Sequence, residues 1–245
     1  MAIRAAEVDF FFELSHAVEV LGLFAKHWTP GEVKTRIAAR TGPDLAARVA
    51  LRLLESVAEE FQSVADQRWL LYTPAEKKSL FERLPRAEHW TLSPQASGDL
   101  GVRLREFFRA GFAAGAERVV AIGADCPAMS AALCREAFQH LALKDSVIGP
   151  ATDGGYYLIG LSRPEFRVFE NIAWSTPATR EQTLQRIAAA GLSCQQLQPL
   201  TDLDEVESFP QIEAELQQAA TPRARELAAY LRSELGPYLV EATSS

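Results

Sequence analysis

Short apolar runs alternate along the chain with longer stretches whose apolar residues recur at helical spacing. Turn-forming or charged residues bound these runs, as expected for strands. The clearest run, Val119-Val120-Ala121-Ile122, is apolar throughout, which is typical of a strand covered on both faces. The pattern predicts strands at residues 17–24, 68–72, 89–92, 117–123, 146–149, 156–161 and 193–197.

The stretches between these runs predict helices. Residues 33–61 carry apolar side chains at helical spacing, and the break at Thr41-Gly42-Pro43 divides them into two helices. Further helices are predicted at residues 75–84, 98–114, 177–190, 210–219 and 222–235, and after Ser130, a suitable N-cap. This alternation predicts an α/β fold, a three-layer αβα sandwich around a mostly parallel sheet. We expect one domain over residues 1–245, with a core at about 17–208 and C-terminal helices at about 209–236.

Composition and charge narrow the class of protein. The chain has 245 residues, 48% of them hydrophobic, and a formal net charge of −7, which disfavours a general nucleic-acid binder. Its 3 cysteines form no Cys-x-x-Cys pair, which favours a reducing compartment and cytoplasmic localisation. Charged residues interrupt the apolar segment 8–25, so we expect neither a signal peptide nor a membrane span.

In parallel α/β sheets, ligands bind beyond the carboxyl ends of the strands. The first candidate segment, residues 24–36, follows the first predicted strand and opens a helix. Lys26, Lys34 and Arg36, with the turn at Pro30-Gly31, fit a phosphate-binding loop. The alternative is a solvated basic helix face.

The second segment places Asp125 at the tip of the strand at residues 117–123, just before the turn at Pro127. A carboxylate there suits Mg²⁺ or Mn²⁺ held jointly with substrate phosphates. The alternative is an aspartate that caps the turn. The neighbouring Cys126 is interpreted as a packed thiol rather than a nucleophile.

The third segment is the glycine-rich stretch 149–161. Asp153 fits a base, a metal ligand or an acceptor for sugar hydroxyls, and Gly154 with Gly155 allows the backbone to approach a ligand closely. The alternative is a plain hairpin turn. Trp174 and Ser175 follow another apolar stretch and are expected at the same mouth, although Trp174 also suits the core.

Two further acidic positions remain. Asp202 and Asp204 follow the last predicted strand, where one of them could reach a metal held by Asp125. Gly98-Asp99 opens a helix, so Asp99 is either an N-cap or a nucleotide contact.

Taken together, these segments resemble a bacterial glycosyltransferase-like family of the GT-A fold, in the nucleotide-diphospho-sugar transferase superfamily. Its members are often labelled as transferases of seleno- or arsenosugar pathways. The matching motifs are Phe-Ala-Lys with Pro-Gly-x-Val-Lys-Thr-Arg at 24–36, Gly-Asp-Leu-Gly-x-Arg at 98–103, Ile-Gly-x-Asp-x-Pro at 122–127, Gly-Pro-x-x-Asp-Gly-Gly-Tyr-Tyr-Leu-Ile-Gly-Leu at 149–161, Trp-Ser-Thr at 174–176 and Thr-Asp-x-Asp at 201–204.

The resemblance implies a Rossmann-like GT-A domain and a transferase that binds a nucleotide sugar or an NTP and a small-molecule acceptor. It implies Mg²⁺ or Mn²⁺ at Asp125 and Asp204, and Asp153, Lys34 and Arg36 as catalytic groups. Trp28 stands where the family usually has proline, and residues 205–208 depart from its usual continuation. We expect a metal-dependent glycosyltransferase; a nucleotidyltransferase and a non-catalytic nucleotide-binding subunit are the alternatives.

Overall fold

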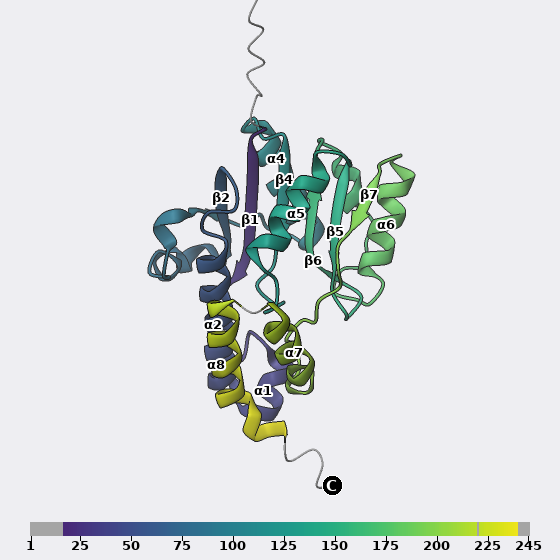
Figure 1. Cartoon of the computed structure of the whole chain (residues 1–245). Coiled ribbons are helices and arrows are strands. Elements are labelled where there is room, and N and C mark those ends of the chain that lie inside the picture. Colours follow the sequence, from purple (N-terminus) through teal and green to yellow (C-terminus); the bar gives the residue numbers. More distant parts are fainter. Residues whose placement is uncertain (1–16, 220, 240–245) are drawn as a thin grey trace, which may run out of the picture.

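A single mostly parallel sheet organises the computed structural model, which describes residues 17–219 and 221–239 (Figure 1). Over these residues the strand order is β3-β2-β1-β4-β6-β5-β7, and β6 alone runs antiparallel to its neighbours. The strands are β1 (Glu19–Lys26), β2 (Gln67–Thr73), β3 (Thr91–Pro94), β4 (Arg118–Ile122), β5 (Ser146–Pro150), β6 (Tyr156–Leu161) and β7 (Cys194–Gln196). Each lies where the apolar pattern predicts a strand.

Helices cover both faces of the sheet. They are α1 (Thr35–Thr41), α2 (Pro43–Glu60), α3 (Lys78–Phe81), α4 (Leu100–Ala113), α5 (Ala131–Leu141), α6 (Thr179–Ala189), α7 (Phe209–Ala219) and α8 (Pro222–Leu239). Short 3₁₀ turns are η1 (Ala75–Lys77), η2 (Ala87–His89), η3 (Phe166–Phe169) and η4 (Val206–Ser208).

The side-chain alternation of the strands divides the core into two layers. On β4, Val120 and Ile122 pack with α2 and α5, while Val119 and Ala121 pack with α4 and α6 on the opposite face. Every one of these four side chains is buried. The predicted three-layer αβα sandwich is therefore confirmed.

The C-terminal helices lie beyond the carboxyl edge of the sheet rather than on one of its faces. In Figure 1, α7 and α8 stand below the strands beside α1 and α2. Leu227, Leu231 and Leu235 recur along one side of α8 and are fully buried in the core cluster that includes α2. The helices α7 and α8 thus lie at the end of the sheet where ligands bind in this class of fold.

The largest departures from the predicted elements lie between residues 75 and 94. The helix expected at 75–84 is broken into η1 and α3, and the strand expected at 89–92 begins only at Thr91. Trp90 is buried with its indole Nε1 donating to the carbonyl of Ala58 (3.1 Å), so the chain turns inward through η2 before it can extend.

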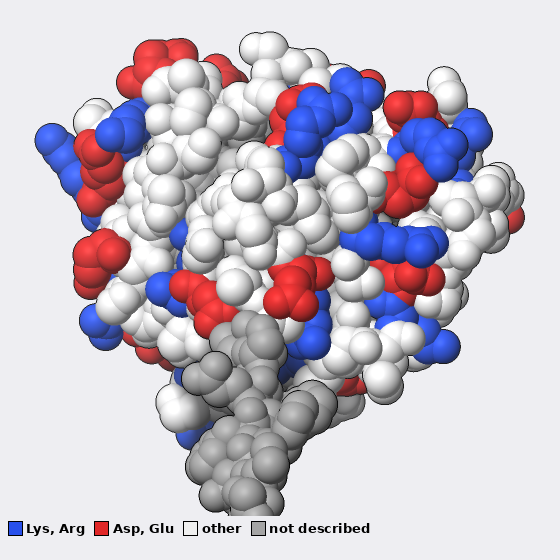
Figure 2. Space-filling model, turned by 90° about the horizontal axis from the view of Figure 1, so that it is seen from above, with Lys and Arg blue, Asp and Glu red and all other residues white. Residues whose placement is uncertain are grey.

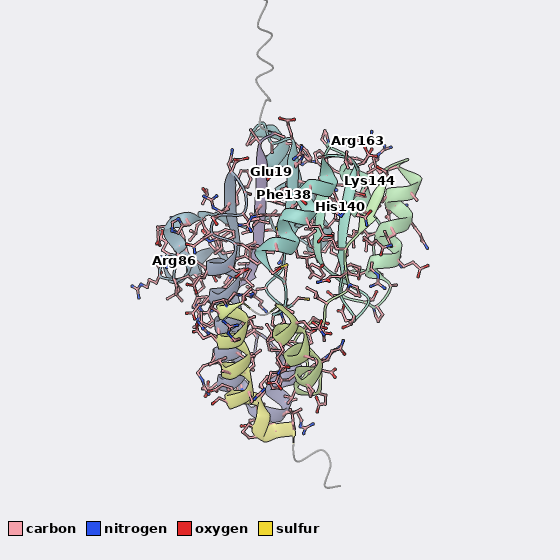
Figure 3. All side chains as sticks on the ribbon, viewed as in Figure 1. Glu19, Arg86, Phe138, His140, Lys144 and Arg163 are labelled. Atoms are coloured by element: carbon pink, nitrogen blue, oxygen red, sulfur yellow. The ribbon has the colours of Figure 1, made fainter. Side chains whose placement is uncertain are left out.

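The opposite end of the molecule carries the amino ends of the parallel strands. Figure 2 shows that Lys and Arg side chains alternate there with Asp and Glu side chains. Figure 3 shows Glu19, Lys144 and Arg163 at this end, while Arg86 points outward beside β2.

None of the helices in the described part of the chain has the length and apolarity to cross a membrane. Residues 8–16 of the apolar segment that was expected to be neither a signal peptide nor a membrane span lie outside the described residues.

Asp145 fastens the edge strand β7 to β5. Its Oδ2 accepts hydrogen bonds from the backbone N and the Oγ of Ser193, both at 2.8 Å, and Arg163 Nε lies 3.3 Å from Oδ1. The two Ser193 bonds, more than the arginine, hold the pKa of Asp145 below its ordinary 3.8.

We expect Asp145→Asn to remove a pH-dependent part of the free energy of unfolding, about 1 kcal/mol. Because the folded-state pKa is lowered, this contribution is complete above pH 3.8 and is lost as the pH falls through the folded value. Urea denaturation of both proteins between pH 3 and pH 6 measures it. An identical pH slope in both proteins would contradict this account.

Candidate active site

A cleft of about 680 Å³ opens at the carboxyl edge of the sheet. Leu100, at the start of α4, lies on its rim. The other walls come from segments 34–36, 123–126, 151–157, 175–179 and 202–204. The cleft therefore brings together residues from all four candidate segments of the sequence.

Lys34 stands at the centre of this arrangement. Its ammonium contacts Asp125 Oδ1 and lies 3.3 Å from Asp204 Oδ1. The Lys34 side chain is only 6% exposed, whereas those of Asp125 and Asp204 are 63% and 46% exposed. One buried cation thus holds two carboxylates that remain open to solvent.

The backbone supports the same contact. Lys34 has φ 45 and ψ 48, a left-handed conformation that is unfavourable for a side chain of this size and that often marks functional positions. Leu203 N donates to the carbonyl of Asp125 (2.9 Å), which ties the Asp204 segment to the tip of β4. The relative position of the two carboxylates is therefore fixed by backbone as well as by charge.

Charge and burial together set the pKa values of Lys34 and Asp125. The Lys34 ammonium holds the pKa of Asp125 below its usual value. Burial alone would lower the pKa of Lys34, but the charges of Asp125 and Asp204 raise it above its usual value. Lys34 and Asp125 are therefore both charged at neutral pH.

Two further carboxylates, those of Asp153 and Asp202, line the same cleft. Burial, together with the charges of Asp153 and Asp204, raises the pKa of Asp202 to about 6. Among the described residues that line the cleft, Asp125, Asp153, Asp202 and Asp204 oppose only two cations, Lys34 and Arg36. The cleft is therefore net acidic.

The other cations of the first loop are partly engaged. Arg36 Nη1 lies 3.2 Å from Glu205 Oε1, so Glu205, one of the departures from the family pattern, directs this side chain. Lys26 Nζ donates to the carbonyl of Glu32 (2.8 Å). Lys26 lines a smaller hollow of about 270 Å³ whose walls also include Lys34, Asp125 and Asp204.

The Asp153 turn is held tightly against the cleft. Gly155 N donates to Asp153 Oδ1 (2.7 Å), and Arg180 N donates to the carbonyl of Gly154 (3.0 Å). Gly154 has φ 94, and a Cβ there would overlap the backbone of Pro177. The turn thus packs against the segment that carries Ser175 and closes the far side of the cleft.

Some predicted site residues take structural positions. Asp99 Oδ1 accepts from Val102 N (2.9 Å) as the N-cap of α4, and Gly98 precedes it. Trp174 packs against Gly101 in the second core layer. The turn residues Pro30 and Gly31 are exposed and line neither the cleft nor the smaller hollow.

Several residues that line the cleft are not among the predicted site residues. Asp202 is predicted only as an alternative metal ligand, Thr176 is expected at the mouth only as part of Trp-Ser-Thr, and Thr35, Tyr156 and Thr179 are assigned no role. The adjacency of Asp202 to Asp204 was the available signal. Its half-burial depends on tertiary packing, which the local sequence does not reveal.

Known proteins support the fold. A family model described as "Uncharacterized protein conserved in bacteria (DUF2064)" matches residues 56–176, a range that includes Asp125 and Asp153. No curated protein matches the chain. A solved structure from Desulfovibrio desulfuricans G20, provisionally assigned as a nucleotide-diphospho-sugar transferase, is 26% identical, with a TM-score of 0.81 and coverage of 91% of this chain and 99% of its own. The chain shares its Rossmann-like GT-A fold with this structure.

More distant structures share this GT-A fold. A nucleotidyl transferase from Methanothermobacter thermautotrophicus is 13% identical, with a TM-score of 0.54 and coverage of 82% of this chain and 99% of its own. CMP:2-keto-3-deoxy-manno-octonic acid synthetase, in complex with CTP, is 11% identical, with a TM-score of 0.52 and the same coverages. The match to the Desulfovibrio structure thus bears out the resemblance inferred from the motifs, and the predicted fold is confirmed.

The donor set of this GT-A cleft fits a hard divalent cation. In the described part of the chain, no three His, Cys, Asp or Glu side chains are grouped so as to enclose a metal by themselves. Asp125 and Asp204 instead present two solvent-open carboxylates at the cleft. Mg²⁺ is commonly held by one or two carboxylates together with substrate phosphates, which is the arrangement these residues allow.

We expect Gly154→Ala to destabilise the fold more than Gly31→Ala does. Both glycines have positive φ, so each substitution carries a backbone cost of about 1–2 kcal/mol. Only at Gly154 does the new Cβ meet a neighbour, the Pro177 backbone, which should add about 2 kcal/mol. Denaturant unfolding of the two variants measures the difference. Equal losses would show that the turn yields freely.

Proposed function

We propose that this protein is a divalent-metal-dependent transferase that uses a nucleotide-diphospho-sugar donor. The observation that carries the proposal is the pair of solvent-open carboxylates, Asp125 and Asp204, held at one cleft by the single buried ammonium of Lys34. The Desulfovibrio structure, provisionally assigned as a nucleotide-diphospho-sugar transferase, supports the donor class.

The acidity of the cleft supports the metal requirement. A diphosphate entering beside four carboxylates and two cations meets net repulsion. Asp125 and Asp204 would hold Mg²⁺ or Mn²⁺, which would supply the positive charge that offsets this repulsion and stabilises a departing diphosphate.

The residues of the chain then have distinct tasks. Lys34 holds Asp125 and Asp204 in register and contributes positive charge close to the phosphates, with Arg36 beside it at the mouth. Asp153 is the candidate base for the acceptor hydroxyl, since its second oxygen is not used by Gly155 N and its side chain lines the cleft. Gly155 and Ser175, on the same wall, are placed to contact the sugar or the acceptor.

The alternative, nucleotidyl transfer from an NTP to a phosphorylated small molecule, is favoured by one specific feature. The smaller hollow shares Lys34, Asp125 and Asp204 with the cleft and adds the ammonium of Lys26. A pyrophosphate leaving group could occupy it on the far side of the metal ligands.

We expect Asp125→Asn and Asp204→Asn each to weaken Mn²⁺-dependent binding of UDP-, GDP- or ADP-sugars. The effect should exceed about 100-fold, since loss of an outer partner of a metal ligand alone commonly costs 10–100-fold. Asp44→Asn makes the same chemical change on the exposed first turn of α2, away from the cleft, and should leave binding unchanged. Calorimetric titration with and without Mn²⁺ measures the three variants.

If Asp125→Asn left nucleotide affinity unchanged with and without metal, the chain would instead be a non-catalytic nucleotide-binding subunit. Absence of binding by the unaltered protein to any nucleotide or nucleotide sugar, with Mn²⁺ present, would contradict both transferase proposals.

The two reactions differ in their products. Glycosyl transfer releases a nucleoside diphosphate from a nucleotide sugar, whereas nucleotidyl transfer releases pyrophosphate from an NTP. We expect nucleoside diphosphate release from a nucleotide sugar and a panel of hydroxyl acceptors, strongly reduced in Asp153→Ala because the base is lost. Coupled assays for the two products separate the candidates. Pyrophosphate release with phosphorylated acceptors would favour the alternative.

A further inference from the structure

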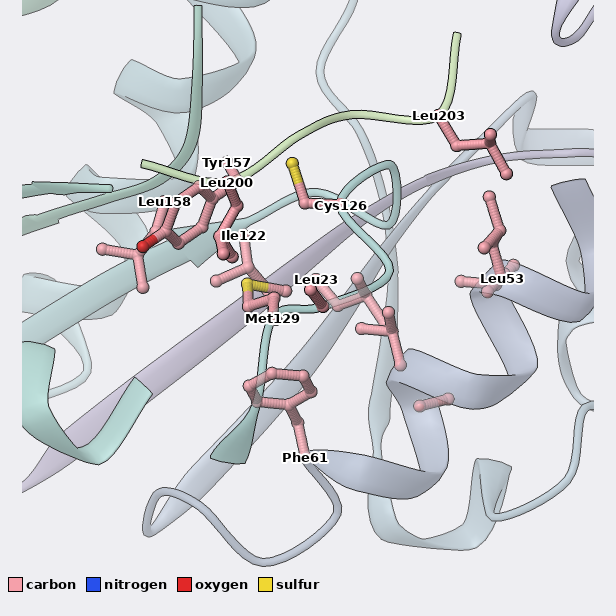
Figure 4. Packing of buried hydrophobic residues seen from close by; sticks show 14 of the residues in the cluster. Leu23, Leu53, Phe61, Ile122, Cys126, Met129, Tyr157, Leu158, Leu200 and Leu203 are labelled. Atoms are coloured by element: carbon pink, nitrogen blue, oxygen red, sulfur yellow. The ribbon is translucent and has the colours of Figure 1, made fainter. Parts of the chain in front are cut away.

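The segment between Asp125 and α5 has no regular secondary structure. It directly follows Asp125, on which the proposed function depends. Residues 126–130 turn back through a hydrogen bond from Met129 N to the carbonyl of Cys126 (3.2 Å). Cys126 and Met129 are buried, and Figure 4 shows their side chains among core residues that include Ile122 and Phe61. We call residues 126–130 the Asp125 loop.

Arg223, nearly a hundred positions later at the start of α8, holds this loop. Its Nη2 donates to the carbonyl of Pro127 (3.2 Å) and its Nη1 to the carbonyl of Met129 (3.1 Å). Its Nε donates to Ser56 Oγ (2.8 Å) and to the Ser56 carbonyl (3.1 Å), so the same guanidinium is anchored on α2. One side chain thus spans α8, α2 and the Asp125 loop.

The setting indicates a built contact rather than a surface ion pair. The Arg223 side chain is 13% exposed, and burial lowers its pKa, so the charge is kept against a desolvation cost. Glu60, 15% exposed and 3.9 Å away, opposes that charge. Glu60 Oε1 also accepts from Ala131 N (2.8 Å), which fixes the other end of the loop.

The geometry points to Arg223 as a positioning residue for Asp125: through the carbonyls of Pro127 and Met129 it sets the loop that aims the carboxylate at the metal and the donor phosphates. This inference rests on the proposed function. Only a planar guanidinium can reach both carbonyls and Ser56 at once, since a lysine ammonium is a point donor. The C-terminal helices would thereby belong to the working site although they line neither of its hollows.

Other contacts keep α8 in place without Arg223, which makes the idea testable. Arg48 Nη2 lies 3.1 Å from Glu234 Oε2, and Arg52 contacts Glu226, so exposed ion pairs also join α2 to α8. Buried leucines along α8 contribute more. Removing the guanidinium of Arg223 should therefore loosen the loop before it detaches the helix.

The experiment compares Arg223→Lys with Arg48→Ala, which removes one of these exposed α2–α8 ion pairs but has no contact with the loop. The first measurement is modification of Cys126 by a thiol reagent, located by peptide mass spectrometry, because this buried thiol becomes accessible when the loop opens. The second is the affinity for Mn²⁺, measured by electron paramagnetic resonance with and without UDP. The third is the thermal unfolding midpoint.

We expect Arg223→Lys to speed modification of Cys126 and weaken Mn²⁺ binding, each by about tenfold. Arg48→Ala should leave both at their unaltered values, even where its unfolding midpoint falls comparably. Unchanged modification of Cys126 in Arg223→Lys overturns the proposal, and so does weakened Mn²⁺ binding without faster modification. Should the unaltered protein bind no Mn²⁺ under either condition, the proposed function fails, while modification of Cys126 still decides whether Arg223 holds the loop.

Discussion

The interaction on which the site depends is the contact of one buried ammonium with two carboxylates. Lys34 is withdrawn from solvent, and a charge in that position is tolerated only because Asp125 and Asp204 neutralise it. Conversely, both carboxylates must lie beside Lys34. The tip of β4 and the segment after β7 therefore lie against the first loop. The left-handed backbone at Lys34 belongs to the same constraint, since it turns the side chain inward just before α1 begins.

Much of this architecture could be predicted from the sequence. The strands were readable because buried parallel strands are continuously apolar, as in Val119–Ile122, and the edge rule then selected the polar residues that follow them. The break between α1 and α2 was readable from Gly42 and Pro43. The irregular stretch 75–90 was not, because the inward path of Trp90 depends on a carbonyl of α2, far away in the chain.

The sequence predicts which residues line the cleft better than it predicts which of them contact one another. Lys34, Arg36, Asp125, Asp153 and Asp204 do line one cleft, yet the sequence suggested free cations facing phosphate, and the structure engages Lys34 and Arg36 with acids. Glu205 illustrates the reason. It was noted only as a departure from a family pattern, and its pairing with Arg36 joins residues 169 positions apart in the chain. Arg223 carried no motif at all.

The order of the chain has a consequence for how the protein matures. In the described part of the chain the last strand, β7, ends at Gln196. A nascent chain that folds from its N-terminus can therefore form the sheet, and pack helices on both faces of it, before α7 and α8 emerge. Arg223 emerges later, with α8. During synthesis the scaffold can therefore form before Arg223 reaches the Asp125 loop, so the contacts that hold this loop are completed only after α8 has emerged.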